Sequence, residues 1–446
     1  MKAFVDFSKE TGKIKAVNGV SNGPVCHGID LSEYFKEAHV SCVRYHDTDG
    51  SAAYGRYMID VSRIFENFDA DEYDENNYRF EHTDKLILAA KYCGAEIIYR
   101  LGESIDHTIY KRYSRPPKDF DKWVRICLQI IRHYNDGWAN GYKLGLTYFE
   151  IWNEPEGHST DGLQPMWSGG TFEQMLELYK KAATAIKAYD GNLKVGGLSF
   201  MYCDFAVEPF LKFCREENLP VDFLSFHHYA QDLEWIVEQV KDAKDLLDKY
   251  AFDNSEIIIA EWAMLFLENY NGIFWDFIAD PIHQCEKNRE LYGNQKNNIG
   301  ASFISAFLIK LNDLPVDKAI LYDFDPNGNW CSLFDRYYEP QKAWYAFKAY
   351  GEMLSESDFR AQAEADAGYI IASTGKDRNT VIYSNFREQF KEVEFVFNGI
   401  GDKQNLKVYS IDENRKFEKI IEKEIADGDT VKIDITKNST LVFYFN

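Results

Sequence analysis

Long apolar runs are missing from this 446-residue chain. No stretch approaches the roughly 20 apolar residues that a membrane-spanning helix needs. The N-terminus also lacks a basic segment followed by an apolar one, so it predicts no secretory signal. We therefore expect a cytoplasmic protein with no membrane partner.

Cysteine motifs are absent as well. The eight cysteines are scattered, and no two of them have the C-x-x-C spacing of a zinc or dithiol site. Reduced thiols in the cytosol are the default interpretation of such a pattern. We expect no metal and no cofactor.

Positive charge is scarce, because 50 Lys and Arg face 72 Asp and Glu, which gives a formal net charge of −22. This charge opposes binding to nucleic acid or to an anionic membrane. Aromatic residues are plentiful, at 16% of the chain. Most must belong to a core, while some could line a groove where rings stack on sugars; composition does not separate the two.

Short apolar strands alternate with helical patterns from residue 14 to residue 354. Eight such pairs predict a (β/α)8 TIM barrel over 14–354. The expected strands are 14–20, 39–45, 95–101, 146–152, 193–199, 221–227, 255–261 and 317–323. The expected helices are 30–38, 82–93, 119–134, 171–188, 205–217, 232–250, 283–311 and 340–354.

The pattern changes after residue 354 to short alternating runs separated by turns. This indicates an antiparallel β-sandwich over 355–446, which the N-terminal strand 1–13 is expected to join. No Ser- or Gly-rich linker separates the two domains, so we expect them to pack tightly. The expected sandwich strands are 369–373, 379–384, 391–398, 405–410, 430–435 and 440–445.

One stretch organises the predicted barrel. The apolar run 146–152 ends abruptly at Asn153-Glu154-Pro155, because proline cannot continue a strand ladder. Glu154 is thus expected at the end of a buried strand, against Phe149 and Trp152. Such apolar surroundings would raise the pKa of its carboxyl toward the range of a proton donor.

The carboxyl ends of barrel strands carry the active site in this fold, so polar residues at those ends are the candidates. Two carboxylates, Glu154 and Glu261, terminate the two most apolar strands. Glycoside hydrolysis uses such a pair, one as proton donor and one ionised. Arg44 near Glu261 would keep the latter ionised, and His227 and Tyr229 could hold the nucleophile or a substrate hydroxyl. Further polar strand-end residues are His46, Asp47, Arg100, Glu103, Asp323 and Asp325.

Each assignment has a structural alternative. Asn153-Glu154-Pro155 could begin a helix, and Glu261 or Arg44 could belong to a buried ion pair alone. His227 and His228 could be ordinary core and surface histidines. The run Asp323 to Gly328 imitates a calcium loop, but the position of the bidentate glutamate falls on Phe334, so the match fails.

These motifs resemble those of a known family. The chain is similar to the retaining glycosidases built on (β/α)8 barrels, and most of all to glycoside hydrolase family 39, the β-xylosidase and α-L-iduronidase family. The similar motifs are Arg44-x-His46, Ile151-Trp-Asn-Glu-Pro155, His227-x-Tyr229, Ala260-Glu-Trp262, and Ser332-Leu-Phe-Asp335 leading into Lys342-Ala-Trp-Tyr-Ala-Phe347.

The resemblance implies a retaining mechanism on a carbohydrate substrate, with Glu154 as acid/base and Glu261 as nucleophile. It implies that Asn153 binds the sugar 2-hydroxyl and that His46, His227 and Tyr229 line the subsite of the cleaved sugar. Strand 8 reads Tyr322-Asp-Phe-Asp325, where the family usually places a tryptophan beneath the sugar. Trp262 or Trp330 would have to supply that platform.

Other functions stay open at this level. A carbohydrate-binding protein without catalysis would share the fold, and an endo-acting hydrolase or transglycosylase would share the residues. The sequence does not name the sugar. Relatives in the resembled clan often assemble, so a homo-oligomer is one expectation.

Overall fold

The structure is a computed structural model of the whole chain. It describes residues 1–26, 28–48, 58–106, 111–159, 166–265, 293–325, 333–357, 359–389, 391–401 and 403–446. All statements below concern these residues.

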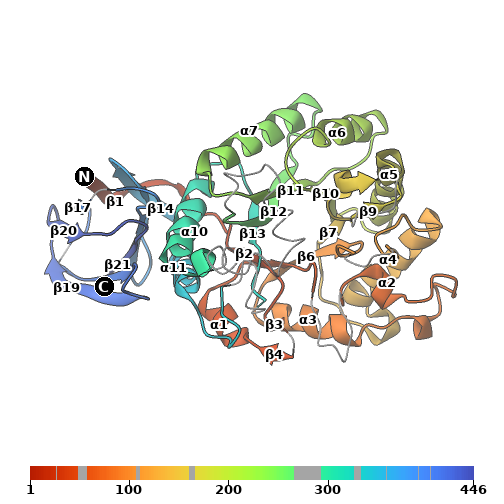
Figure 1. Cartoon of the computed structure of the whole chain (residues 1–446), viewed down its shortest axis with the longest axis horizontal. Helices are drawn as coiled ribbons and strands as arrows, with labels where there is room; N and C mark the ends of the chain where they lie inside the picture. The colour runs from red at the N-terminus through yellow and green to blue at the C-terminus, as the bar shows by residue number, and fades with distance from the viewer. Residues whose placement is uncertain are drawn as a thin grey trace, which may run out of the picture.

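Eight parallel strands close into a barrel in chain order, so the predicted TIM barrel is confirmed (Figure 1). The ends of each strand lie within two residues of those of an expected run, except that the first two strands, β2 and β5, begin later than predicted. The strands are β2 (Gly19–Ser21), β5 (Cys42–Arg44), β6 (Glu96–Leu101), β7 (Tyr148–Ile151), β10 (Lys194–Phe200), β11 (Phe223–Tyr229), β12 (Glu256–Ala263) and β13 (Lys318–Leu321).

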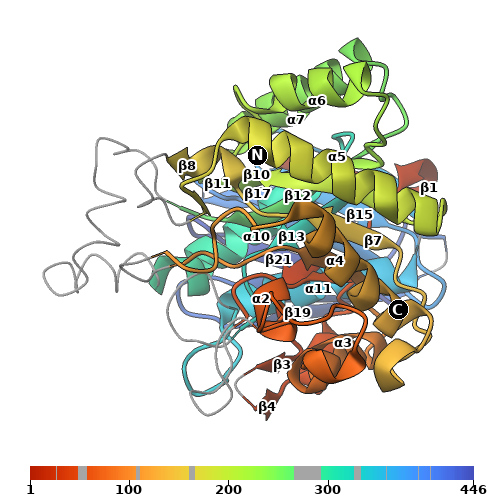
Figure 2. The ribbon, with the colours of Figure 1, turned by 90° about the vertical axis from the view of Figure 1, so that its right-hand side faces the viewer.

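Helices surround the barrel, as Figure 2 shows for α4 and α5. They are α1 (Ser32–Glu37), α2 (Val61–Ile64), α3 (Glu81–Tyr92), α4 (Phe120–Asn135), α5 (Phe172–Tyr189), α6 (Val207–Glu216), α7 (Leu233–Lys249), α10 (Asn298–Leu311) and α11 (Lys342–Glu356). α5 begins in a capping box between Thr171 and Gln174, which satisfies two otherwise unpaired backbone amides. None of the described helices combines the length and apolarity that crossing a membrane would require.

The barrel interior is solid below its mouth. Side chains from six strands fill it with one apolar cluster: Cys42, Ile98, Tyr148, Phe223, Ile258, Ala260 and Ile320. Because this layer leaves no channel through the barrel, the polar side chains at the carboxyl ends of the strands rest on a rigid apolar floor.

A nine-stranded, mostly antiparallel sheet forms the second unit and encloses its own apolar core, which confirms the predicted β-sandwich. Its spatial order is β19-β18-β21-β16-β15-β14-β1-β17-β20. Its strands are β1 (Lys2–Lys13), β14 (Phe359–Ala365), β15 (Tyr369–Ser373), β16 (Asn379–Ser384), β17 (Glu392–Asn398), β18 (Gln404–Ile411), β19 (Glu418–Ile425), β20 (Thr430–Asp434) and β21 (Thr440–Phe445).

Two of these strands, β14 and β19, were not expected from the sequence. β19 lies at the edge of the sheet, and its residues are largely Glu and Lys. Edge strands often carry charged residues that prevent further pairing, which hides their alternating pattern. β14 is paired on both sides but alternates small and charged residues, so it has little apolar signal.

Helix α10 lies between the barrel and the sandwich (Figure 1). Eleven of its 14 residues are buried, as expected of a helix that is covered on both sides. Phe303 contacts Phe307 within the helix and Phe386 of the sandwich, with ring centroids 5.6 and 5.4 Å apart. The hydroxyl of Ser384 donates to the carbonyl of Ser302 over 2.7 Å. The two units therefore share one packed interface.

Replacing Phe303 by Ala should lower the free energy of unfolding by roughly 3–5 kcal/mol, because it empties a buried aromatic site between the units. Chemical denaturation would measure the change. The matched control is Phe205→Ala, since Phe205 is 74% exposed and its removal should change stability by less than about 0.5 kcal/mol. Equal effects of the two variants would contradict this account of the interface.

Candidate active site

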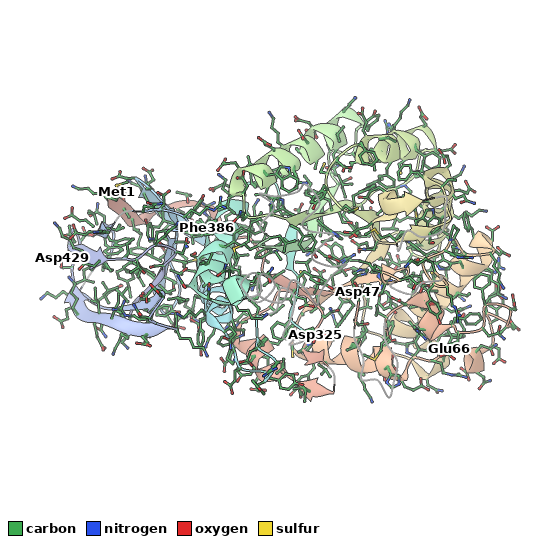
Figure 3. All side chains as sticks on the ribbon, in the orientation of Figure 1. Met1, Asp47, Glu66, Asp325, Phe386 and Asp429 are labelled. Atoms are coloured by element: carbon green, nitrogen blue, oxygen red, sulfur yellow. The ribbon has the colours of Figure 1, made fainter. Side chains whose placement is uncertain are left out.

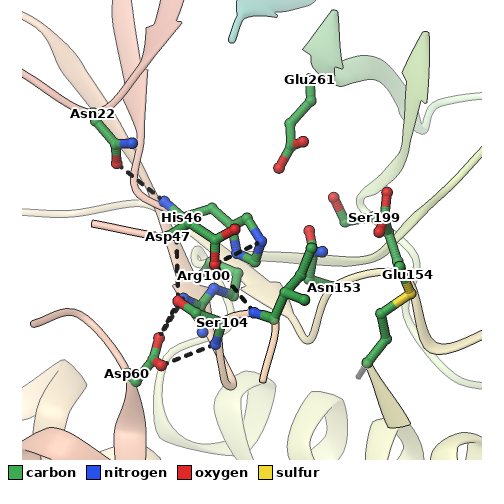
Figure 4. A network of polar contacts seen from close by, with 12 residues as sticks. Asn22, His46, Asp47, Asp60, Arg100, Ser104, Asn153, Glu154, Ser199 and Glu261 are labelled. Carbon is green, nitrogen blue, oxygen red and sulfur yellow. Dashed lines mark hydrogen bonds and ion pairs between the residues drawn. The ribbon is translucent and has the colours of Figure 1, made fainter. Parts of the chain in front are cut away.

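Polar side chains from four remote parts of the chain meet at the mouth of the barrel, and Figure 4 shows Asn153, Glu154 and Glu261 among them. β5 ends in Arg44, β7 leads into Asn153 and Glu154, β11 ends in His227 to Tyr229, and β12 carries Glu261 near its end. The strands are parallel, so their carboxyl ends share one rim. The sequence placed these residues at strand ends, and the closed barrel brings them into contact.

Arg44 holds this group together. Its guanidinium is completely buried and donates to Glu150 from Nε over 2.6 Å and to Glu261 from Nη1 over 2.7 Å. Nη2 donates to the Asn153 side-chain oxygen over 2.7 Å and to the Ser199 hydroxyl over 2.8 Å. One cation thus connects β5 with residues from β7, β10 and β12, in the fork geometry that only arginine provides.

The two glutamates share one histidine. His227 Nδ1 lies 2.7 Å from Oε1 of Glu154 and 3.6 Å from Oε2 of Glu261. The Tyr229 hydroxyl donates to the same Glu261 oxygen over 2.5 Å. Both carboxyls are largely buried, at 8% and 5% exposed, and both face the barrel mouth. Asn153-Glu154-Pro155 also leads into a short 3₁₀ helix, Pro155–Gly157, so the alternative of a helix start is borne out beside the position of Glu154 in this cluster.

A hydrogen-bonded chain joins Arg44 to Glu154. Ser199 accepts from Arg44, and its oxygen lies 2.8 Å from Nε2 of His227. Arginine can only donate, so the Ser199 hydroxyl is free to give its own hydrogen to Nε2. In neutral His227 the proton then resides on Nδ1, which donates to Glu154. The orientation of Glu154 therefore depends on Arg44 through two intermediates.

The backbone that presents Glu154 is strained. Trp152 and Glu154 both have positive φ, at 67° and 47°, which is uncommon outside glycine. Gly102 makes room for this turn, since a Cβ at Gly102 would lie only 3.0 Å from the Cα of Trp152. Such strain persists where surrounding contacts hold it, and it concentrates at functional sites.

A second polar network lies beside the first (Figure 4). Arg100 donates to Asp60 over 2.6 Å, and the Ser104 hydroxyl donates to the same oxygen over 2.8 Å. The Asp47 amide donates to Ser104, and the Asp47 carboxyl, 18% exposed, lies 3.4 Å from Nε2 of His46. Burial, with the negative charges of Glu261 and Asp60, raises the pKa of Asp47 to about 7.

More carboxyls surround the mouth. Asp323 follows β13, and its burial beside Asp325 raises its pKa well above the usual range. Burial does the same for Glu156, next to Glu154, and for Glu103, next to Asp60. Within the described part of the chain, no group of three His, Cys, Asp or Glu residues is arranged to hold a metal ion.

Comparison with known proteins bears directly on this site. Residues 99–287, which include Glu154, His227 and Glu261, match the family model for glycosyl hydrolases family 39. Over these residues the chain is similar to glycosyl hydrolases of family 39.

Two curated relatives carry the name beta-xylosidase. That of Caldicellulosiruptor saccharolyticus is 34% identical over 244 residues, which are 52% of this chain and 47% of the relative. That of Geobacillus stearothermophilus is 26% identical over 239 residues, 47% of this chain and 44% of the relative. The chain thus spans about half the length of the curated relatives that it matches.

Solved structures share the architecture along the whole chain. A glucosidase from Croceicoccus marinus superposes with a TM-score of 0.81 at 19% identity, covering 100% of this chain and 98% of that one. A monomeric beta-xylosidase from Caulobacter crescentus CB15 gives 0.72 at 15% identity, covering 100% and 99%. The GH39 enzyme from Xanthomonas axonopodis pv. citri gives 0.74 at 16%, covering 100% and 97%. At these identities the likeness concerns the fold alone.

The structure corrects two expectations about site residues, those for Trp262 and Arg44. Trp262 is fully buried and stacks on Phe307 of α10, so it faces the helix layer and cannot be a sugar platform. Neighbouring strand residues face opposite sides, and Glu261 takes the inner one. Arg44 is too deeply buried and too fully bonded to contact substrate directly. Trp330 lies outside the described residues.

The expected aromatic wall beside Glu154 is also wrong. Trp152 packs between Trp123 and Trp167, and Phe149 contacts Tyr99, so both rings point away from the mouth. His227 is the neighbour of Glu154 instead. The positions of Asn153, His46, His227 and Tyr229 are compatible with the predicted subsite for the cleaved sugar. That these residues contact a sugar remains a prediction.

Two residues of the cluster were missed. Glu150 is a lone acid in the apolar strand β7. Because a buried charge must be paired, its presence there could have predicted a buried ion pair. Ser199 is the second-to-last residue of β10, in a run of small and apolar residues that gives no comparable signal. Both bind Arg44, which only the closed barrel reveals.

The raised pKa of Asp47 predicts a pH-dependent stability. Aspartates of an unfolded chain titrate near about 3.9, so the stabilisation from protonated Asp47 is full below about pH 4. It is lost as the pH rises through about 7, the value in the folded protein. The free energy of unfolding of the wild type should therefore fall relative to that of Asp47→Asn between pH 4 and pH 8. Parallel curves would show that Asp47 titrates normally.

Proposed function

We propose that the protein is a retaining, β-xylosidase-like glycoside hydrolase that cleaves glycosides or short oligosaccharides. Glu154 acts as the acid/base and Glu261 as the nucleophile. The observation that carries the proposal is the convergence of both carboxyls on His227 at the barrel mouth. The beta-xylosidase names of the two curated relatives support the reaction class.

The spacing of the carboxyls supports retention. The separation between Oε1 of Glu154 and Oε2 of Glu261, one oxygen of each carboxyl, cannot exceed the sum of their distances to His227 Nδ1, 2.7 and 3.6 Å. That bound lies below the roughly 6.5–9.5 Å that an inverting pair needs to admit water beside the sugar. A pair this close favours direct attack on the anomeric carbon by one carboxylate.

The surroundings of Glu261 suit a nucleophile. It accepts hydrogen bonds on both oxygens, from Arg44 on Oε1 and from Tyr229 on Oε2. These two donors fix the orientation of the carboxylate, and each of its oxygens accepts a hydrogen bond. In the first step, an oxygen of Glu261 bonds to the anomeric carbon while the bond to the leaving oxygen breaks.

Glu154 supplies the proton for that leaving oxygen. His227 fixes one of its oxygens, which leaves the other for the substrate. Once ionised, Glu154 takes a proton from water, and the hydroxide so formed attacks the anomeric carbon. The ester bond to Glu261 then breaks, the sugar is released with retained configuration, and both glutamates return to their starting states.

The mouth favours a neutral sugar over a uronate. Arg44 is engaged by Glu150 and Glu261, and Arg100 pairs with Asp60 through Nη2 alone. Asp47 and Asp323 add carboxyls beside Glu261, and both have raised pKa values. A protonated carboxyl can donate to a sugar hydroxyl, whereas an ionised one would repel a carboxylate on the substrate.

A set of aryl glycosides tests this function. The wild type should hydrolyse the β-xyloside or another neutral glycoside and leave the iduronide intact. Glu261→Ala should lower kcat by roughly a thousandfold or more because it removes the nucleophile, while substrate binding is largely kept. Glu261→Gln controls for the loss of packing. Activity of Glu261→Ala within tenfold of wild type would refute the assignment, and binding without any hydrolysis by wild type would favour an inactive carbohydrate-binding protein.

Glu154→Ala should distinguish substrates by their leaving group. For a xyloside with an alcohol leaving group, kcat/KM should fall by about 10²–10⁴-fold, because the departing oxygen needs a proton. For the dinitrophenyl xyloside, whose phenolate is a weak base, kcat/KM should change far less. Steady-state kinetics on both substrates measure this difference. An equal loss on both would assign the acid role elsewhere.

A further inference from the structure

A second cavity lies beside the barrel; it shares Glu103 with the carboxyls around the mouth, but neither Arg44, Glu154, His227 nor Glu261 lines it. It has a volume of about 670 Å³, within the range of small-molecule sites. Its wall includes Trp152, whose ring faces away from the mouth, and Trp123 of α4. Glu66 also lines it and marks its position at the end of the molecule opposite Met1 and Asp429 of the sandwich (Figure 3).

A large part of the lining of this cavity, here called its floor, is apolar. Phe65, Phe68, Trp123 and the consecutive prolines Pro116 and Pro117 contribute to it. Faces of this kind stack on aromatic rings and on the apolar faces of sugar rings. A ring-shaped ligand therefore fits the floor.

The rim is cationic, in a chain whose net charge is −22. Lys111, Arg112, Arg115 and Lys118 line the cavity, against the two carboxyls of Glu66 and Glu103. Glu103 is already bound, since the amide and the hydroxyl of Ser62 donate to its two oxygens over 3.0 and 2.5 Å. The local charge is thus opposite to that of the whole protein.

Two of the cations are available to a ligand. Arg112 and Arg115 are exposed, and neither guanidinium forms an ion pair within the described part of the chain. The loop that carries them is anchored nevertheless. The Ser168 amide donates to the Ser114 carbonyl over 2.9 Å, and Arg63 of α2 stacks on Tyr113, 4.8 Å from the ring centroid. Guanidinium groups on an anchored loop match the geometry of a carboxylate.

We propose that this cavity binds a ring that carries a carboxylate, either an aromatic acid or a uronic acid residue. The ring stacks on the apolar floor, and its carboxylate pairs with Arg112 and Arg115. The site is distinct from the proposed catalytic mouth, where both arginines are engaged by acids. It would accept an acidic part of a substrate, or a separate acidic ligand, that the mouth itself rejects.

Calorimetric titration of the full-length protein tests this site, with 4-hydroxybenzoate and methyl β-D-glucuronide as probes. At least one should bind saturably, and more weakly as salt is added. The double variant Arg112→Gln/Arg115→Gln should weaken binding by about tenfold or more, since it removes charge-assisted hydrogen bonds. Which probe binds identifies the source of the carboxylate.

Matched controls isolate the cause. Arg215→Gln makes the same chemical change on the surface of α6 and should leave the dissociation constant within about twofold. The neutral counterparts, 4-hydroxybenzyl alcohol and methyl β-D-glucoside, should bind much more weakly than the acids. Glu261→Ala should retain the binding, so a failure of the proposed hydrolysis would not affect this result. Absence of saturable binding by both acids, equal binding of the neutral probes, or an unchanged constant in the double variant would overturn the proposal.

Discussion

The interaction on which the site depends is the buried ion cluster of Arg44 with Glu150 and Glu261. Desolvating a charge is costly unless it is paired, so each member requires the others. Removing one partner from such a cluster typically costs about 3–5 kcal/mol. The guanidinium binds residues from three further strands or strand ends. These hydrogen bonds fix the relative positions of the side chains at the mouth. The geometry of the two glutamates follows from that arrangement.

The same cluster couples the two glutamates. Arg44 bonds Glu261 directly and reaches Glu154 through Ser199 and His227. A shift of the guanidinium would therefore move the proposed nucleophile and the proposed acid together. The apolar layer beneath, with no channel through it, gives this network a rigid base. The strained backbone at Trp152 and Glu154 is held by these contacts rather than by local preference.

Charge is distributed unequally around the barrel. Acids surround the mouth, and its two arginines are engaged, whereas the neighbouring cavity has exposed cations on an apolar floor. The carboxyls of Asp47 and Asp323 have raised pKa values, so the mouth is less negative than its formal charges suggest. Two adjacent concave sites can thus select ligands of different charge on one scaffold.

The sequence by itself determined the architecture and the position of the two candidate glutamates at strand ends. Apolar runs of strand length end in polar residues, and that local pattern survives any tertiary context. It did not determine the direction in which the tryptophan side chains point. Trp262 and Trp152 both pack against helices, on the outer side of the barrel, because Glu261 and the strained turn at Trp152 and Glu154 occupy the inner side. The sequence did not predict edge strand β19, because the charged residues that protect a sheet edge from further pairing obscure the alternating apolar pattern of a strand. Only barrel closure could bring Ser199 and Glu150 to Arg44, since contacts between remote strand ends depend on how the sheet closes.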